Sequence, residues 1–229
     1  MRRGGDGRSK LAVGLSLAGA VLALLALAQL LLPRIAASRI SSRVGRYGSV
    51  ASVSVSAWPA VKLLWGDADS VHVTARHLSL SPAQAAKLIW EGRGTARMDV
   101  SAQSVMVGPL ELEHARLQKR DGALSAVASA SEADVRAALP PGWQVQLLGS
   151  AGGQVTVRAG GGLFGVGASV RAVALAREGR LVAHPLGALL EGLQLTLFSD
   201  PHVHVDGIGA SRDAGQSSTY RLSMRASLR

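Results

Sequence analysis

The chain has 229 residues, and its 25 lysines and arginines against 15 aspartates and glutamates give a formal charge of +10. Apolar residues make up 48% of the chain and charged residues 17%, which excludes a disordered polyelectrolyte and favours one folded domain or two small ones. The sequence contains no cysteine, so disulfide frameworks, thiolate metal sites and cysteine nucleophiles are excluded. Aromatic residues make up 3%, too few for a stacking platform that binds single-stranded nucleic acid.

The N-terminus has the pattern of a membrane signal. Residues 11–32 carry no charge. As a helix this run would be about 33 Å long, which matches a hydrocarbon core of about 30 Å. Basic residues dominate positions 1–10, and basic flanks remain in the cytoplasm. The sequence therefore predicts a basic cytoplasmic tail at 1–10, a single-pass transmembrane signal anchor at 11–32 and an extracytoplasmic domain at 33–229.

A cleaved signal peptide is the alternative interpretation of the same run. Ala26-Leu27-Ala28 has the A-x-A pattern of a cleavage site. The apolar run continues beyond it to Leu32, however, and its length favours a retained anchor. Both interpretations place the rest of the chain outside the cytoplasm.

A helix is expected directly after the span, over residues 34–46. One side of it is apolar and another is basic. The basic residues are candidates for contact with lipid headgroups or the membrane surface, and an ordinary solvated helix face is the alternative. They are Arg34, Arg39, Arg43 and Arg46.

From Ser49 onward, apolar and polar residues alternate with a period of two, which predicts half-buried antiparallel strands. The last strand, up to Leu228, shows this most clearly. Turn residues such as Asp121-Gly122 separate the runs. Because strands and helices do not alternate, the pattern predicts a long antiparallel meander of about nine strands.

Two further helices interrupt these strands. The first is expected to begin at Ser81, an N-cap that forms a capping box with Gln84, and to end at Gly92. The second is expected from about Ser131 to Leu139, where two prolines stop it.

No motif points to catalysis or to a cofactor. Gly160–Gly165 satisfies G-x-G-x-x-G, but a strand pattern follows it where a dinucleotide site needs a helix, so we interpret it as a hairpin turn. His202, His204 and Asp206 share one strand face without a further identifiable ligand, which favours a polar strand face over a metal site. The basic residues are spread along the chain, which argues against nucleic acid as a partner. We therefore expect no catalytic residue, metal or cofactor.

The connection Ala57–Gly66 interrupts the alternation with an apolar segment that contains two of the four tryptophans. Such a segment can line a lipid pocket or enter a membrane interface, and the alternative is a loop folded over the end of the core. The candidate lipid-binding residues are Trp58, Pro59, Val61, Leu63, Leu64 and Trp65.

This segment carries a family resemblance. In chain order, the basic tail, the span, the arginine-rich helix, a Val-x-Val strand, Trp58-Pro59, Leu63-Leu64, Gly66 and the strand from Val71 to Arg76 resemble the LmeA-like phospholipid-binding family of actinobacterial envelopes. The helix after Ser131, the strands on either side of Gly160 and, more loosely, Asp200 to Ile208 resemble the same family.

The resemblance implies an α+β fold, in which a long curved antiparallel β-sheet with a few packed helices, similar to tubular lipid-binding folds, cups an apolar groove. It also implies phospholipid and membrane as partners, envelope biosynthesis proteins as further partners, and a non-catalytic role in envelope lipid or lipoglycan biogenesis. A one-sided sheet must cover its apolar face, and a lipid would cover what three helices leave open. Two alternatives remain: a non-catalytic envelope scaffold that recruits a protein, and an exported hydrolase with an unrecognised site.

Overall fold

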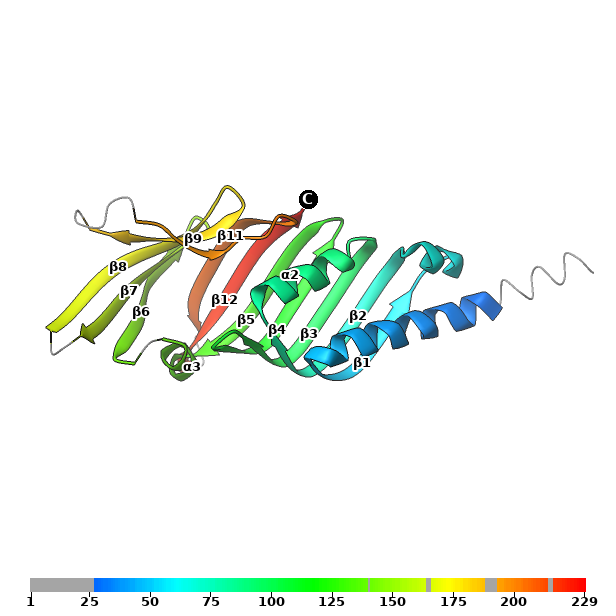
Figure 1. Cartoon of the computed structure of the whole chain (residues 1–229), viewed down its shortest axis with the longest axis horizontal. Coiled ribbons are helices and arrows are strands. Elements are labelled where there is room, and N and C mark those ends of the chain that lie inside the picture. The colour runs from blue at the N-terminus through cyan, green and yellow to red at the C-terminus, as the bar shows by residue number, and fades with distance from the viewer. Residues whose placement is uncertain (1–26, 140, 164–165, 188–192, 214–215) are drawn as a thin grey trace, which may run out of the picture.

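The computed structural model describes residues 27–139, 141–163, 166–187, 193–213 and 216–229. Over these residues the chain forms a seven-stranded and a five-stranded sheet, which follow one another along an elongated molecule (Figure 1). The predicted cytoplasmic tail and residues 11–26 of the predicted span lie outside the described residues.

The seven-stranded sheet has the order β1-β2-β3-β4-β5-β12-β11. Its strands are β1 (Gly48–Ser56), β2 (Ala68–Leu80), β3 (Thr95–Val107), β4 (Leu110–Arg120), β5 (Ala123–Ser131), β12 (Gln216–Leu228) and β11 (Val203–Asp213). The five-stranded sheet has the order β10-β9-β8-β7-β6. Its strands are β10 (Leu195–Phe198), β9 (Arg180–Leu186), β8 (Val166–Arg177), β7 (Gln154–Leu163) and β6 (Trp143–Ala151).

The structure departs from the predicted single antiparallel meander in three ways. The strands form two sheets instead of one, β5 pairs with β12 and not with its chain neighbour β6, and one pair is parallel. β2 and β3 run parallel, with Val73 opposite Val100, and α2 (Pro82–Glu91) connects them. Parallel neighbours need such a crossover, because a tight turn can only reverse the chain. The expectation of an antiparallel sheet is therefore wrong for this pair, while the other pairs are antiparallel.

The predicted helix ends are confirmed for α2. Ser81 Oγ accepts a hydrogen bond from Gln84 N, Gln84 Oε1 accepts one from Ser81 N, and Gly92 is the C-cap. In α3 (Glu132–Ala137), Ser131 caps the first turn by accepting from Asp134 N. These short-range hydrogen bonds satisfy backbone donors that a helix start leaves unpaired.

The N-terminal helix is described over residues 27–44 and continues into η1 (Gly45–Tyr47). It therefore joins the end of the predicted span to the predicted arginine-rich helix in one element. Among the helices in the described part of the chain, none combines the length and the apolar character needed to cross a membrane.

The helices cover two parts of one apolar face of the seven-stranded sheet. Ile40 and Val44 of the N-terminal helix pack on the cluster that contains Val71 and Val73. Ala86 of α2 joins a second cluster, made with Leu124, Val203 and Ala226 of three strands. The α2 crossover therefore closes the core of β5, β12 and β11, three strands to which it is not directly connected in sequence.

The two sheets meet at β11. Backbone N–H groups of this strand donate to the hairpin tips of the five-stranded sheet: Val205 N to Gly179 O at 2.9 Å and Ile208 N to Gly153 O at 3.2 Å. Ala210 N donates to Ser150 Oγ at 3.0 Å. An edge strand is thus paired by turns instead of by another strand, which protects it from edge-to-edge association.

Candidate functional site

The tryptophan segment between β1 and β2 forms a short 3-10 helix, η2 (Ala60–Trp65). Gly66 ends it with φ 85°, a left-handed conformation that glycine adopts without strain, and donates its N–H to Leu63 O. Ala60 is almost completely buried, with 1% of its surface exposed. The segment is therefore an ordered part of the domain.

The six candidate lipid-binding residues divide into two groups. Val61 and Leu63 are half-buried, and Leu63 packs against the Val71–Val73 cluster. Trp58 and Trp65 each have 73% of their surface exposed, and Leu64 has 66%. Pro59 is exposed as well. Burying one such apolar side chain is worth about 1.5–3 kcal/mol. Exposure of these four residues to water is therefore unfavourable, and contact with an apolar partner would stabilise them.

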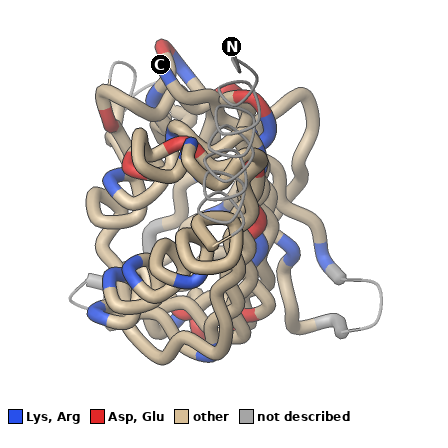
Figure 2. The backbone as a smooth tube through the Cα atoms, turned by 90° about the vertical axis from the view of Figure 1, so that its right-hand side faces the viewer, with Lys and Arg blue, Asp and Glu red and all other residues tan. Residues whose placement is uncertain are grey.

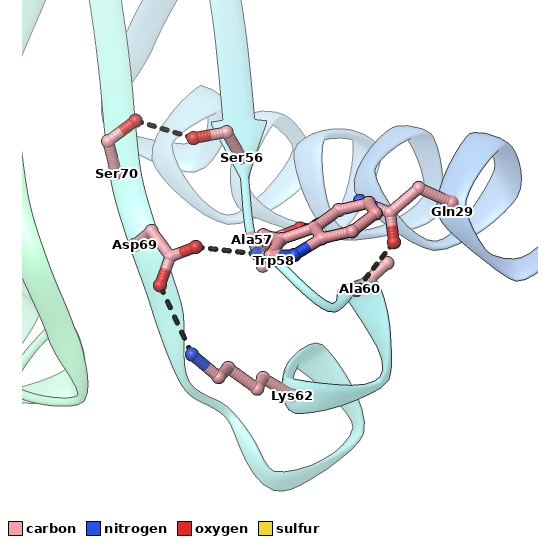
Figure 3. Close-up of polar contacts among 8 residues, drawn as sticks. All are labelled: Gln29, Ser56, Ala57, Trp58, Ala60, Lys62, Asp69 and Ser70. Atoms are coloured by element: carbon pink, nitrogen blue, oxygen red, sulfur yellow. Dashed lines mark hydrogen bonds and ion pairs between the residues drawn. The ribbon is translucent and has the colours of Figure 1, made fainter.

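Polar contacts hold the segment against its surroundings (Figure 3). The side chain of Gln29, on the N-terminal helix, donates to Ala57 O at 3.1 Å and accepts from Ala60 N at 2.7 Å. Asp69 of β2 accepts from Trp58 N at 2.5 Å and pairs with Lys62 Nζ at 3.6 Å. The tryptophans are thus presented from a backbone that is fixed on two sides.

The start of the N-terminal helix lies at the same end of the molecule as η2 (Figure 1). This part of the helix carries exposed leucines. We define the apolar end surface as Leu27, Leu30, Leu31, Trp58, Leu64 and Trp65. Each of these residues exposes at least 50% of its surface. Six such side chains at one end exceed the scattered apolar residues of an ordinary soluble surface, and a patch of this kind marks an interaction site.

The four arginines predicted to meet headgroups follow along the same helix and just after it. Arg43 forms an ion pair with Glu91 of α2 at 2.8 Å and so links the two helices. Arg34, Arg39 and Arg46 are exposed. At 1.5 Å per residue, Arg34 lies only about 5 Å beyond Leu31 along the axis, whereas Arg39 lies about 12 Å beyond it. Basic and acidic residues both occur on this end of the molecule, and several basic positions lie near one another at the lower left of the view (Figure 2).

The centre of the apolar sheet face is only half-buried. The side chains there lie on one face, because they are opposite one another in register across the strands or two residues apart on the same strand. We call these residues the central apolar row. They are Leu117 of β4, Ala126 of β5, Leu222 and Met224 of β12, and Ile208 of β11.

A cavity of about 310 Å³ lies where the two sheets and α3 meet. Its walls come from α3, β6 and β7, which follow one another in the chain, and from β11, which is distant from them in sequence. The lining residues are Glu132, Arg136, Gln144, Val145, Gln146, Arg158, Gly160 and Arg212. No local pattern in the sequence predicts this arginine pocket, because its three arginines occur singly in α3, β7 and β11.

The remaining polar candidates have structural neighbours. His202 stacks on Trp90 of α2 with ring centroids 4.1 Å apart, and His204 Nε2 lies 3.8 Å from Asp206. Within the described residues, no three metal-ligating side chains form a cluster that could hold an ion. Of the predicted glycine turn, Gly160 and Gly161 lie in β7 and pair with β8, and residues 164–165 fall outside the described residues.

Lys119 is the one fully buried charged side chain in the described residues. It lies on the apolar sheet face, opposite Met98 and Leu124. Its Nζ donates to Thr95 O and, at 2.9 Å, to Arg93 O, and so holds the loop between α2 and β3. Burial lowers the pKa of Lys119 because it disfavours the charged form, and Asp121 partly opposes the shift.

Comparison with family models finds one match, the LmeA-like phospholipid-binding family, over residues 23–217. The match spans the N-terminal helix, the tryptophan segment and the residues of the arginine pocket. No curated protein and no solved structure matches the chain.

Proposed function

Because the chain belongs to the LmeA-like phospholipid-binding family, we propose that it is a membrane-anchored, outward-facing phospholipid-binding protein. It acts in cell-envelope lipid or lipoglycan biogenesis, by binding lipid and not by catalysis. The observation that carries the proposal is the apolar end surface, where Trp58 and Trp65 are 73% exposed on a fixed backbone.

The position of this surface supports attachment to a membrane. The last residues of the uncharged run 11–32 belong to the N-terminal helix and include the exposed Leu27, Leu30 and Leu31. If that run spans the bilayer, the tryptophan segment lies at the level where the helix leaves the hydrocarbon. Tryptophan favours this interface because its ring is apolar and its N–H is polar. The domain then contacts the membrane on which it is anchored.

The same geometry indicates which of the four arginines is near enough to the membrane to contact headgroups. The headgroup layer on each side of the hydrocarbon core is roughly 5–8 Å thick, from a core of about 30 Å within a bilayer of about 40–45 Å. Arg34, about 5 Å beyond Leu31, falls within this layer, whereas Arg39 falls beyond it. Arg43 is engaged with Glu91. Arg34 is therefore the headgroup contact, and the other three arginines lie farther out.

Within the domain, the central apolar row is the surface for an acyl chain. Leu117, Met224 and Ile208 are half-buried on a face of which the helices cover two other parts. An acyl chain placed along them would bury apolar area that is now open to water, at about 25 cal/mol for each Å². The exposed residues of the tryptophan segment contact membrane lipid, and Val61 and Leu63 attach the segment to the core.

Lipid bound to the purified protein tests this function. The full chain is purified from membranes in mild detergent and examined by native mass spectrometry, and its lipids are extracted and identified. We expect intact phospholipid bound to the protein. A protein free of phospholipid in several lipid-rich preparations would favour the scaffold function, and fatty acids or lysophospholipids that accumulate with time would favour a hydrolase.

A further inference from the structure

We propose that the arginine pocket binds a phosphate group, supplied either by the headgroup of a phospholipid or by a small free phosphate. The pocket is defined by Arg136 of α3, Arg158 of β7 and Arg212 of β11. The lipid case rests on the proposed function, whereas the free-phosphate case does not.

The charge balance of the pocket favours an anion. Three arginines are among its lining residues, against a single acidic residue, Glu132. Glu132 lies 3.6 Å from Arg136, so its charge is directed at one arginine only. Like charges around one cavity repel, and an anion between them removes that cost. A guanidinium offers two parallel N–H groups to two oxygens of a carboxylate or a phosphate. Three arginines favour phosphate, because it presents more charged oxygens than the two of a carboxylate.

The rest of the lining suits a phosphate ester. Gln144 and Gln146 of β6 add neutral amide groups, which both donate and accept hydrogen bonds. They lie on the same face of the five-stranded sheet as Arg158, since Gln146 is opposite Arg158 in register. The volume of about 310 Å³ is at the lower end of ligand pockets, which span about 300–1,000 Å³. It accommodates a headgroup, with the chains of the lipid outside.

The apolar face of the seven-stranded sheet begins next to this pocket. In β11, Arg212 lies opposite Tyr220, and the next pairs on the same face are Ala210 with Leu222 and Ile208 with Met224. Arg212 therefore ends a row of apolar side chains in which Tyr220, directly opposite it, is buried. The residues farther along the row, Leu222, Ala210, Met224 and Ile208, are half-buried. A molecule with a phosphate at one end and an acyl chain at the other matches this order, because its charge meets Arg212 while its chain follows the central apolar row.

Binding measurements on the detergent-solubilised full chain test the proposal. Phosphatidylglycerol and phosphatidylcholine with identical acyl chains are titrated into the wild type, into Arg158→Gln with Arg212→Gln, and into a control with Arg97→Gln and Arg180→Gln. The control removes the same number of exposed arginines outside the pocket. Inorganic phosphate is titrated by calorimetry, and also as a competitor of phosphatidylglycerol.

We expect the pocket variant to bind phosphatidylglycerol about tenfold more weakly or worse, since each lost hydrogen bond to a charged group is equivalent to roughly that factor. The control should bind as the wild type does. Inorganic phosphate that binds the wild type and not the pocket variant also supports the site, and identifies free phosphate as a source.

Unchanged affinity of the pocket variant for both phosphatidylglycerol and inorganic phosphate would overturn the proposal. In that case, continued binding of either phospholipid would leave the proposed function intact. If the wild type binds neither phospholipid, the proposed function fails, and the inorganic phosphate titration alone decides whether the pocket is an anion site.

Discussion

The Ala60 N–H donates a hydrogen bond of 2.7 Å to Oε1 of Gln29, and thereby joins the start of η2 to the N-terminal helix. Nε2 of the same Gln29 side chain donates to Ala57 O at 3.1 Å. In the sequence, Gln29 is one of two polar residues in an apolar run. Its amide pairs with the backbone on both sides of the Trp58-Pro59 bend, which explains why a polar side chain stands at this position.

We expect Gln29→Leu to loosen the tryptophan segment. Leucine has a similar size but leaves the Ala60 N–H and the Ala57 C=O without their partner, at about 1–3 kcal/mol for each group if water cannot reach it. Hydrogen exchange at Ala60 should become roughly tenfold faster or more. The control is Gln103→Leu on the exposed side of β3, and unchanged protection at Ala60 would show that the contact is not stabilising.

Replacing both exposed tryptophans should affect lipid contact more than stability. Because Trp58 and Trp65 are 73% exposed, the double variant to serine should unfold within about 0.5 kcal/mol of the wild type. In proteoliposomes, quenching of tryptophan fluorescence by brominated phospholipid should be largely lost.

A matched control is Trp143→Ser in β6, where the indole ring lies against Gly161. That change should lower stability by about 1–3 kcal/mol and leave the quenching in place. If the double variant is strongly destabilised instead, Trp58 and Trp65 belong to the core and the membrane contact is wrong.

The anchor is tested by fractionation of cells that express the full chain. We expect the protein to stay in the membrane after a carbonate wash, because residues 11–32 are long and apolar enough to span it. Cleavage after Ala28 would release a soluble protein that begins at Gln29. Recovery of that N-terminus would replace the anchor with a signal peptide.

Stability should depend on pH through Lys119. Its pKa is lowered from 10.5 in the folded protein, so the folded state releases this proton at a lower pH than the unfolded state does. Between the lowered pKa and 10.5 the unfolded state binds more protons, and stability rises with pH. Below that window both states are charged and the folded protein carries the full cost of burying the ammonium.

Denaturant unfolding of the wild type and of Lys119→Met over this pH range measures the effect. The free energy of unfolding of the wild type should increase relative to the variant as pH approaches 10.5. Lys87→Met, which removes an exposed positive charge on α2, should show no such divergence. A constant difference between wild type and Lys119→Met would contradict the buried, charged state of this side chain.

The contact between the sheets should be sensitive to Gly179. This residue has φ 78°, and a Cβ there would overlap the ring of His204. Gly122 has φ 89° with open space around it, so Gly122→Ala incurs only the left-handed backbone cost of roughly 1–2 kcal/mol. Thermal melts should show a larger loss for Gly179→Ala, and His204→Ala should restore the additional part.

Local signals in the sequence determined the short-range structure. Ser81 and Gln84 sit three residues apart, and their reciprocal hydrogen bonds depend on nothing beyond the first turn of α2. The alternation in Tyr220–Leu228 likewise determined which side chains of β12 face the core, since successive residues of a strand point to opposite sides. The apolar tryptophan segment was recognisable for the same reason, because it interrupts the alternation that begins at Ser49. Its exposure was not predicted and came from the structure.

Tertiary structure alone decided which segments became neighbours. The helix predicted between Ser81 and Gly92 allows the strands on either side to run parallel. Whether they become neighbours depends on α2 packing with Leu124, Val203 and Ala226, distant residues that bury its apolar side. Arg136, Arg158 and Arg212 likewise carry no common sequence signal. They meet because β11 pairs with β12 on one side and with the hairpin tips of the five-stranded sheet on the other. Burial of apolar area drives these long-range contacts, and it depends on the whole chain and not on any one window of it.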